Sequence, residues 1–170
     1  MPDVIIGQIL GIIATCLTFV SYQANTKKWV LIIQTAATLF TGVSYFFLQA
    51  MSGLLLNLVC IVRNVTFYFQ DEKSKVNRIS AVVLAVIMLI LGAISWQGWS
   101  SLLIMTALSA NTIFLSFGIP QLLRKSILFT STLILIYNCF VFSIGGIVNE
   151  SVAIVSSVVG IVRFRRQKTE

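Results

Sequence analysis

Polar and charged side chains interrupt several long apolar stretches of this sequence, and they are the residues best equipped for chemistry. Arg63 is the clearest case, because it lies about 15 Å along an apolar stretch that begins near Gly53, at 1.5 Å of rise per helical residue. An unpaired polar group inside hydrocarbon is costly, so such side chains tend to face other helices or water. The pattern therefore predicts a polar interior within an apolar bundle.

Amides, hydroxyls and a guanidinium supply hydrogen bonds for holding a polar solute. The candidate cavity residues are Tyr45, Asn57, Arg63, Asn64, Asn111, Asn138, Ser156 and Ser157. For any one of them, a hydrogen bond between helices, of roughly 0.6 kcal/mol, is the commoner role. Because the set is spread over both halves of the chain, it favours one shared cavity. Arg63 would either face that cavity, where it favours an anionic solute, or extend along its helix toward the membrane surface.

The sequence contains no recognisable catalytic or metal-binding set. It has no histidine, and Cys16, Cys60 and Cys139 stand singly inside apolar stretches without a CxxC pair. Serines occur without a neighbouring base, and there is no P-loop. We therefore expect neither an enzyme nor a bound metal or cofactor.

The composition is that of an integral membrane protein. Of the 170 residues, 58% are hydrophobic and 10% are charged, whereas soluble domains carry about 25% charged residues. Seven apolar stretches are predicted to be membrane-spanning helices: Val4–Tyr22, Trp29–Ala50, Gly53–Gln70, Ile79–Ile94, Ser101–Gln121, Ser126–Phe142 and Ile147–Phe164.

Basic residues fall on alternate sides of these seven stretches. All lysines and arginines except Arg63 lie in the first, third and fifth connections and in the C-terminal tail. The positive-inside rule then predicts seven crossings of a membrane, with the N-terminus outside and the C-terminus in the cytoplasm. Short loop clusters of this kind are topology signals, and nucleic-acid binding is not expected.

The first three and last three stretches look like two copies of one unit. Phe19–Gln23 is matched by Phe117–Gln121, and Ile61-Val62-Arg63 is matched by Ile161-Val162-Arg163. We predict an all-α fold with a 3+1+3 arrangement, in which two parallel triple-helix bundles are joined by a linker helix. The expected divisions are 1–70 for the first bundle, 71–99 for a cytoplasmic loop plus the linker helix, and 100–170 for the second bundle and basic tail. Parallel repeats of this kind enclose solute sites in many carriers.

Pro120-Gln121, followed by a basic loop, resembles the PQ-loop motif of the SWEET, MtN3 and PQ-loop transporter superfamily. The run from Ser143 to Glu150 and the later Ile161–Phe164 look like the bacterial YgjV-type inner-membrane protein family. The likeness covers nearly the whole chain and implies the 3+1+3 fold. Two features depart from the superfamily, because Tyr22-Gln23 replaces the first PQ pair and the last stretch has no mid-span asparagine.

Several residues near the ends of the predicted helices are candidates for gates or hinges. They are Tyr22, Gln23, Pro120, Gln121 and Glu150. Pro120 is expected to kink the fifth stretch, as a proline removes one backbone donor. Gly145-Gly146 is expected to form a turn, which would put Glu150 at the outer start of the last stretch. The superfamily resemblance implies an inner gate at the PQ pair.

The function predicted from these features is a membrane carrier that moves a small polar or anionic solute by alternating access. Without a clear intramembrane acid, facilitated diffusion is expected over proton-driven transport. The alternative is a receptor, chaperone or assembly factor that uses the same bundle to bind a partner. Because both halves lie in one chain, either a monomer or a homo-oligomer is compatible with a closed cavity.

Overall fold

The computed structural model describes residues 2–22, 27–70, 74–117 and 120–166. This part of the chain is all-helical, as predicted, and each of the seven predicted stretches corresponds to one helix. The helices are α1 (Pro2–Tyr22), α2 (Lys27–Phe47), α3 (Met51–Phe69), α4 (Lys75–Ile94), α5 (Trp99–Ser116), α6 (Pro120–Phe140) and α7 (Ile144–Arg166).

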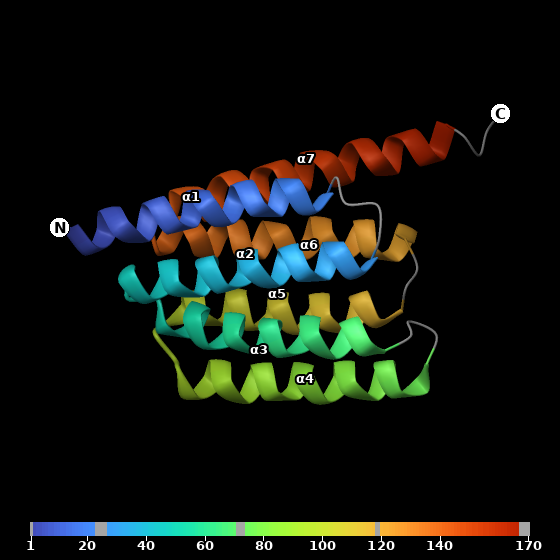
Figure 1. Cartoon of the computed structure of the whole chain (residues 1–170), viewed down its shortest axis with the longest axis horizontal. Coiled ribbons are helices and arrows are strands. Elements are labelled where there is room, and N and C mark those ends of the chain that lie inside the picture. The colour runs from blue at the N-terminus through green and yellow to red at the C-terminus, as the bar shows by residue number, and fades with distance from the viewer. Residues whose placement is uncertain (1, 23–26, 71–73, 118–119, 167–170) are drawn as a thin grey trace.

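Consecutive helices run in alternating directions and lie nearly side by side (Figure 1). Along the chain, α1 packs on α2 and α2 on α3, while α5 packs on α6 and α6 on α7. Two further contacts, α1 with α7 and α3 with α5, join these rows. Six helices therefore form a closed ring in the order α1, α2, α3, α5, α6, α7, and α4 lies outside it against α3 and α5.

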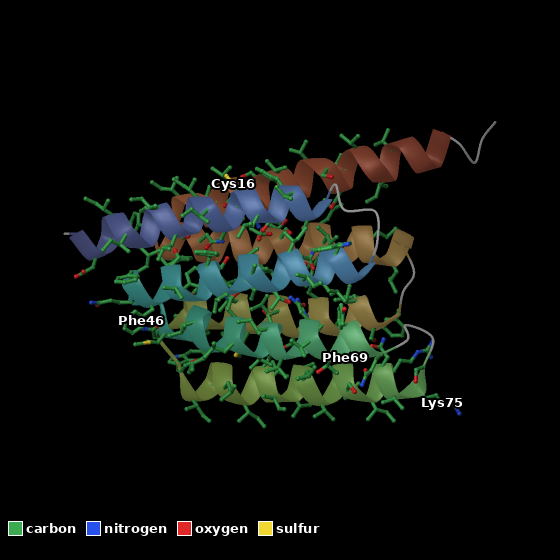
Figure 2. The ribbon with its side chains drawn as sticks, in the orientation of Figure 1. Cys16, Phe46, Phe69 and Lys75 are labelled. Atoms are coloured by element: carbon green, nitrogen blue, oxygen red, sulfur yellow. The ribbon has the colours of Figure 1, made fainter. Side chains whose placement is uncertain are left out.

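The outer surface of the ring is apolar, as a membrane protein requires. Four helices, α1, α3, α4 and α5, are long and apolar enough to cross a bilayer, and α2, α6 and α7 contain shorter apolar segments. Carbon atoms dominate the outward faces (Figure 2), and Cys16, Phe46 and Phe69, which are labelled there, are exposed. Because these faces would be poorly solvated in water, they fit contact with lipid.

The α4 helix shows how a single stripe of residues fixes its position. Ala81, Leu84, Ala85 and Met88 recur at helical spacing and are buried, whereas Val82 and its outward neighbours are exposed. The small alanines let α4 approach closely, and its buried face packs on α3 and α5.

The α2–α3 and α6–α7 turns have the same construction. Gln49 and Phe142 are the two non-glycine residues with positive φ, at 57° and 54°, among the described residues. In the first turn, Ala50 N–H donates to Tyr45 O, and in the second Ser143 N–H donates to Asn138 O. Tyr45 and Asn138 are 93 residues apart. Each backbone hydrogen bond of the first turn recurs in the second turn between residues whose numbers are higher by 93.

Two expectations about helix ends are wrong. Pro120 is the first residue of α6, so it does not kink the fifth helix. A proline suits this position because the first helical N–H has no partner within the helix. Gly145 and Gly146 lie in the first turn of α7, and Phe142 with its positive φ makes the preceding turn.

Candidate functional site

A cavity of about 200 Å³ lies inside the ring, and all six ring helices contribute to its wall. The polar lining residues are Thr18, Gln34, Thr38, Thr41, Tyr45, Asn57, Arg63, Asn64, Asn111, Asn149 and Glu150. Apolar contacts come from α2, α5 and α6. A wall in which polar groups outnumber apolar ones, inside a bundle with an apolar exterior, is suited to a small polar solute.

Arg63 is buried, with 7% of its surface exposed, and it lines this cavity. Its Nε and Nη2 donate to the Asn64 side-chain oxygen at 3.2 and 3.0 Å, and its Nη1 donates to the Thr112 hydroxyl at 3.3 Å. These contacts hold the guanidinium between α3 and α5. Of the two readings of Arg63, the structure gives the cavity-facing one.

Glu150 also lines the cavity, although the sequence placed it at the outer start of the last helix. Since α7 begins at Ile144, the carboxylate stands about 9 Å along the helix, nearly two turns in. The Asn149 amide donates to it at 3.0 Å, and the Ser131 hydroxyl of α6 hydrogen-bonds to it. The cavity therefore contains both a guanidinium and a carboxyl group.

Hydrogen bonds close the end of the ring that holds the α2–α3 and α6–α7 turns. Tyr45 Oη donates to Asn138 Oδ1 at 2.8 Å, and Gly53 N–H donates to Tyr137 Oη at 3.1 Å. The two tyrosine rings pack edge to face, with centroids 5.7 Å apart. Beside them is a smaller chamber of about 40 Å³, lined in part by Asn138 and Glu150.

Glycines allow the helices of this closed end to meet. A Cβ on Gly145 would run into the backbone of Gly11, so α1 and α7 approach at two facing glycines. A Cβ on Gly53 would lie 2.6 Å from Tyr137 Oη. Thr15 strengthens the first contact, because its hydroxyl hydrogen-bonds to Gly145 O at 2.8 Å. Small residues that bring helix backbones together are typical of membrane interfaces.

The predicted cavity residues divide into three groups. Tyr45, Asn57, Arg63, Asn64 and Asn111 line the main cavity. Asn138 lines the smaller chamber. The remaining two do not line either space: Ser156 is exposed and Ser157 is buried. A solute-facing role for this serine pair stays a prediction, because Ser156 and Ser157 lie seven residues, about two turns, beyond Asn149 and Glu150 on the same face of α7.

The predicted inner gate lies largely outside the described residues. This applies to Gln23 and to the side chains of Tyr22, Pro120 and Gln121. Their helix positions show that the two motifs are not counterparts, since Tyr22 ends α1 whereas Pro120 begins α6. By the separation of 93 residues, Pro120 instead corresponds to Lys27, the first residue of α2.

The sequence analysis missed several lining residues, mainly threonines and Asn149. Thr18, Thr38 and Thr41 each donate to the carbonyl four residues earlier, so they read as ordinary helix residues. The internal repeat could have indicated Asn149. The residue 93 positions after the cavity residue Asn57 is Glu150, and Asn149 directly precedes it.

Two other features of the described residues are less suited to bind a polar solute. An apolar groove of about 280 Å³ lies on the surface between α2 and α3, and Asn64 borders it as well as the cavity. Within the described ranges, no cluster of three or more His, Cys, Asp or Glu side chains could hold a metal ion. The central cavity is the site with the strongest chemistry.

Comparison with known proteins agrees with the apolar helical structure. A family model named Imp-YgjV and described as a bacterial inner membrane protein matches residues 5–168, which is nearly the whole chain. Neither the curated proteins nor the solved structures include a significant match. The family predicted from the sequence is thus confirmed, and the chain belongs to the Imp-YgjV family of bacterial inner membrane proteins.

Proposed function

We propose that this protein is a SWEET- or PQ-loop-like carrier that moves a small polar or anionic solute across the inner membrane by alternating access. The observation that carries the proposal is the central cavity, which six helices surround and whose wall combines Arg63 and Glu150 with amide side chains from α2, α3, α5 and α7. Charged groups inside a membrane bundle are costly and are typical of solute or ion pathways.

The ring is proposed to consist of two parallel copies of one three-helix unit, with α4 as the linker. In this arrangement α1 corresponds to α5, α2 to α6 and α3 to α7. The contact between α1 and α7 then has its counterpart in the contact between α5 and α3, and both contacts are present. The two copied turns and the paired positions Tyr45 and Asn138 fit the same two-fold relation. Parallel repeats that meet around a shared site are one known plan for carriers.

The orientation follows from charge. The described basic residues Lys75, Arg78 and Lys125 lie at the end of the bundle where α4 and α6 begin, and Lys27 begins α2 at that end too (Figure 1). The positive-inside rule assigns this end to the cytoplasm. The N-terminus and the closed end of the cavity would then face outward.

In this conformation the carrier would be closed on its outer side. Besides the tyrosine contacts, Gln8 of α1 accepts from Ile144 N–H at 2.9 Å and donates to Phe142 O. These bonds join the two proposed repeats near the outer surface. Rocking of one repeat against the other would break them and open the cavity outward. The roles of Tyr22, Gln23, Pro120 and Gln121 as an inner gate are part of the same proposal.

The energy source is open to direct measurement. The expectation of facilitated diffusion rested on the absence of an intramembrane acid, and Glu150 in the cavity removes that reason. A buried carboxyl group is a common proton carrier in transporters. Uptake should therefore be compared with and without an imposed pH gradient across the membrane.

Purified protein in liposomes tests the proposal. Uptake of radiolabelled sugars, carboxylates and amino acids would be measured for the native chain and for Asn57→Ala, with Leu58→Ala as the matched control. Asn57 lines the cavity and Leu58 is 46% exposed on the outer face. We expect flux of at least one solute class, reduced only by Asn57→Ala. Absence of flux for every class would reject the carrier and favour a receptor or assembly factor.

A further inference from the structure

The cavity holds two opposite charges that the protein does not pair with each other. Among the residues that the structure describes, Asp3 and Glu150 are the only carboxylates, and Asp3 lies in the first turn of α1. Arg63 donates to Asn64 and Thr112, and Glu150 hydrogen-bonds with Asn149 and Ser131. All four partners are neutral. Each charge therefore lacks the compensation that a buried ion normally finds.

The two charges stand at different depths and come from different halves of the ring. By the separation of 93 residues, Glu150 corresponds to Asn57, and Arg63 lies six residues beyond Asn57, about 9 Å further along the helix axis. The same register equates Arg63 with Ser156. One half thus supplies the cation and the other supplies the carboxyl group.

Next to each of these two groups lies an amide atom without a hydrogen-bond partner. Asn64 accepts from Arg63 through Oδ1, and its Nδ2 is buried without a hydrogen-bond partner. Asn149 donates to Glu150 through Nδ2, and its Oδ1 is buried without a partner. A spare donor therefore stands beside the guanidinium and a spare acceptor beside the carboxyl group. Buried atoms of this kind are rarely left unsatisfied in a working protein.

We infer that the solute is a small amphoteric molecule with its carboxylate and its ammonium group several bonds apart, as in an ω-amino acid. Its carboxylate would bind Arg63, and its ammonium group would donate to Glu150. Asn64 Nδ2 and Asn149 Oδ1 have no exposed surface in this conformation, so the two amide side chains would turn toward the solute to hydrogen-bond with it. The cavity of about 200 Å³ limits it to a small molecule. An α-amino acid fits less well, because both of its charges sit on one carbon. This inference rests on the proposed carrier function and narrows its solute class.

Three solutes of similar size separate the possibilities. They are 4-aminobutanoate, 4-hydroxybutanoate, which lacks the ammonium group, and 2-aminobutanoate, whose charges are adjacent. In proteoliposomes of the native chain we expect uptake of 4-aminobutanoate to exceed that of each of the others at least tenfold. Equal uptake of 4-amino- and 4-hydroxybutanoate, or faster uptake of 2-aminobutanoate, would overturn the inference while leaving the carrier function in place.

Single-residue variants test which side chains produce the preference for 4-aminobutanoate. Glu150→Gln should abolish the tenfold preference for 4-aminobutanoate and retain uptake of 4-hydroxybutanoate, whereas Arg63→Met should lose both. Val148→Ala, on the exposed face of α7, is the matched control and should behave like the native chain. A Glu150→Gln protein that keeps the full preference would count against the assignment.

Binding gives a second readout that does not depend on transport. In detergent, 4-aminobutanoate should raise the melting temperature of the native protein, and 4-hydroxybutanoate should raise it less. Asn149→Leu, which removes both the spare acceptor and the amide that donates to Glu150 without changing a charge, should weaken the 4-aminobutanoate effect selectively. If no solute crosses the membrane but this binding pattern holds, the solute class is supported and the carrier function fails. If neither flux nor a selective thermal shift is seen, both are rejected.

Discussion

Arg63 illustrates the difference between a residue that stabilises a fold and one that equips a site. Its hydrogen bonds to Asn64 and Thr112 are with neutral groups, and it is nearly fully buried. Removing a charge from water costs several kcal/mol, and neutral hydrogen bonds recover only part of that cost. Because burying Arg63 costs folding free energy, a role in binding explains its position better than a role in stabilising the fold.

This argument predicts that Arg63→Met reduces function without reducing stability. Uptake of carboxylate-bearing solutes should fall at least tenfold, equivalent to about 1.4 kcal/mol of lost binding. The melting temperature should stay the same or rise, because a buried charge is replaced by an apolar side chain of similar length. Flux assays and thermal unfolding of the same preparation measure the two effects. Arg63→Lys, which keeps the charge, is the control and should retain part of the uptake; a large loss of stability in Arg63→Met would show a mainly structural role.

The sequence identified the arginine of the cavity and the amides of Asn57, Asn64 and Asn111, but it placed neither Asn149 nor the carboxyl group there. Arg63, Asn57 and Asn64 stand out because polar residues are rare inside an apolar stretch. Glu150 was predicted at the outer start of the last helix because the predicted helix began at Ile147, whereas α7 begins at Ile144. The glycines before it suggested a turn, while the turn itself is formed by Phe142, whose positive φ is unusual for an aromatic residue. A shift of a few residues in the boundary thus hid the acidic half of the site.

At the scale of the helix, the contact between α1 and α7 depends on the absence of side chains. Gly11 and Gly145 face each other, and a Cβ on Gly145 would overlap the α1 backbone. Gly42 provides a contrast, since a Cβ there would lie 3.6 Å from its nearest neighbour, which is ordinary contact. Gly42 and Gly145 both lie within helices, but only Gly145 is in close contact with the backbone of another helix.

Gly145→Ala is therefore expected to destabilise the protein and Gly42→Ala is not. Forcing a methyl group into a tight interface costs about 1–3 kcal/mol, because α1 and α7 must separate. In Gly42→Ala the added methyl group meets no such obstacle, and alanine is the better helix former by about 1 kcal/mol. Thermal unfolding in detergent would compare the two variants. A similar melting temperature for both would contradict the close packing of α1 on α7.

The existence and order of the helices could be read from apolar length and loop charge, whereas their pairing could not. Apolar runs give the number of helices, and basic clusters give the ends. The join between α5 and α6 was misplaced because Ile119-Pro120-Gln121 continues an apolar run, and only three residues, 117–119, separate the two helices. The α1–α7 and α3–α5 contacts that close the ring link residues far apart in the chain, which no local pattern encodes.

For the whole molecule, the proposed topology has a direct test. With an outward N-terminus and a cytoplasmic C-terminus, a C-terminal green fluorescent protein should fluoresce and a C-terminal alkaline phosphatase should be inactive, because phosphatase needs an oxidising compartment to form its disulfides. Fusions truncated after the α4–α5 turn, near Trp96 and Gln97, should show the opposite pattern. Active phosphatase at the C-terminus would reverse the orientation.

The closed outer end predicts how the whole molecule responds when one bond across the ring is removed. Tyr45→Phe keeps the ring but loses the hydrogen bond to Asn138, worth about 0.6 kcal/mol in a membrane, which shifts a two-state equilibrium about threefold. If that bond holds the outer end closed, cavity residues should become more accessible from outside. In a variant without Cys16, Cys60 and Cys139, a single cysteine at Asn57 would report this accessibility. An impermeant maleimide added outside should label Asn57→Cys about threefold faster with Tyr45→Phe.

A cysteine at Trp96, which is 48% exposed in the α4–α5 turn, supplies the reference, since its labelling should not depend on Tyr45. Equal acceleration at both positions would indicate general loosening of the bundle. An unchanged rate at Asn57 would show that the tyrosine–asparagine bond does not hold the outer end closed. Because Tyr45→Phe alters neither charge nor cavity-facing amides, a selective increase at Asn57 connects one hydrogen bond to the movement of the two halves.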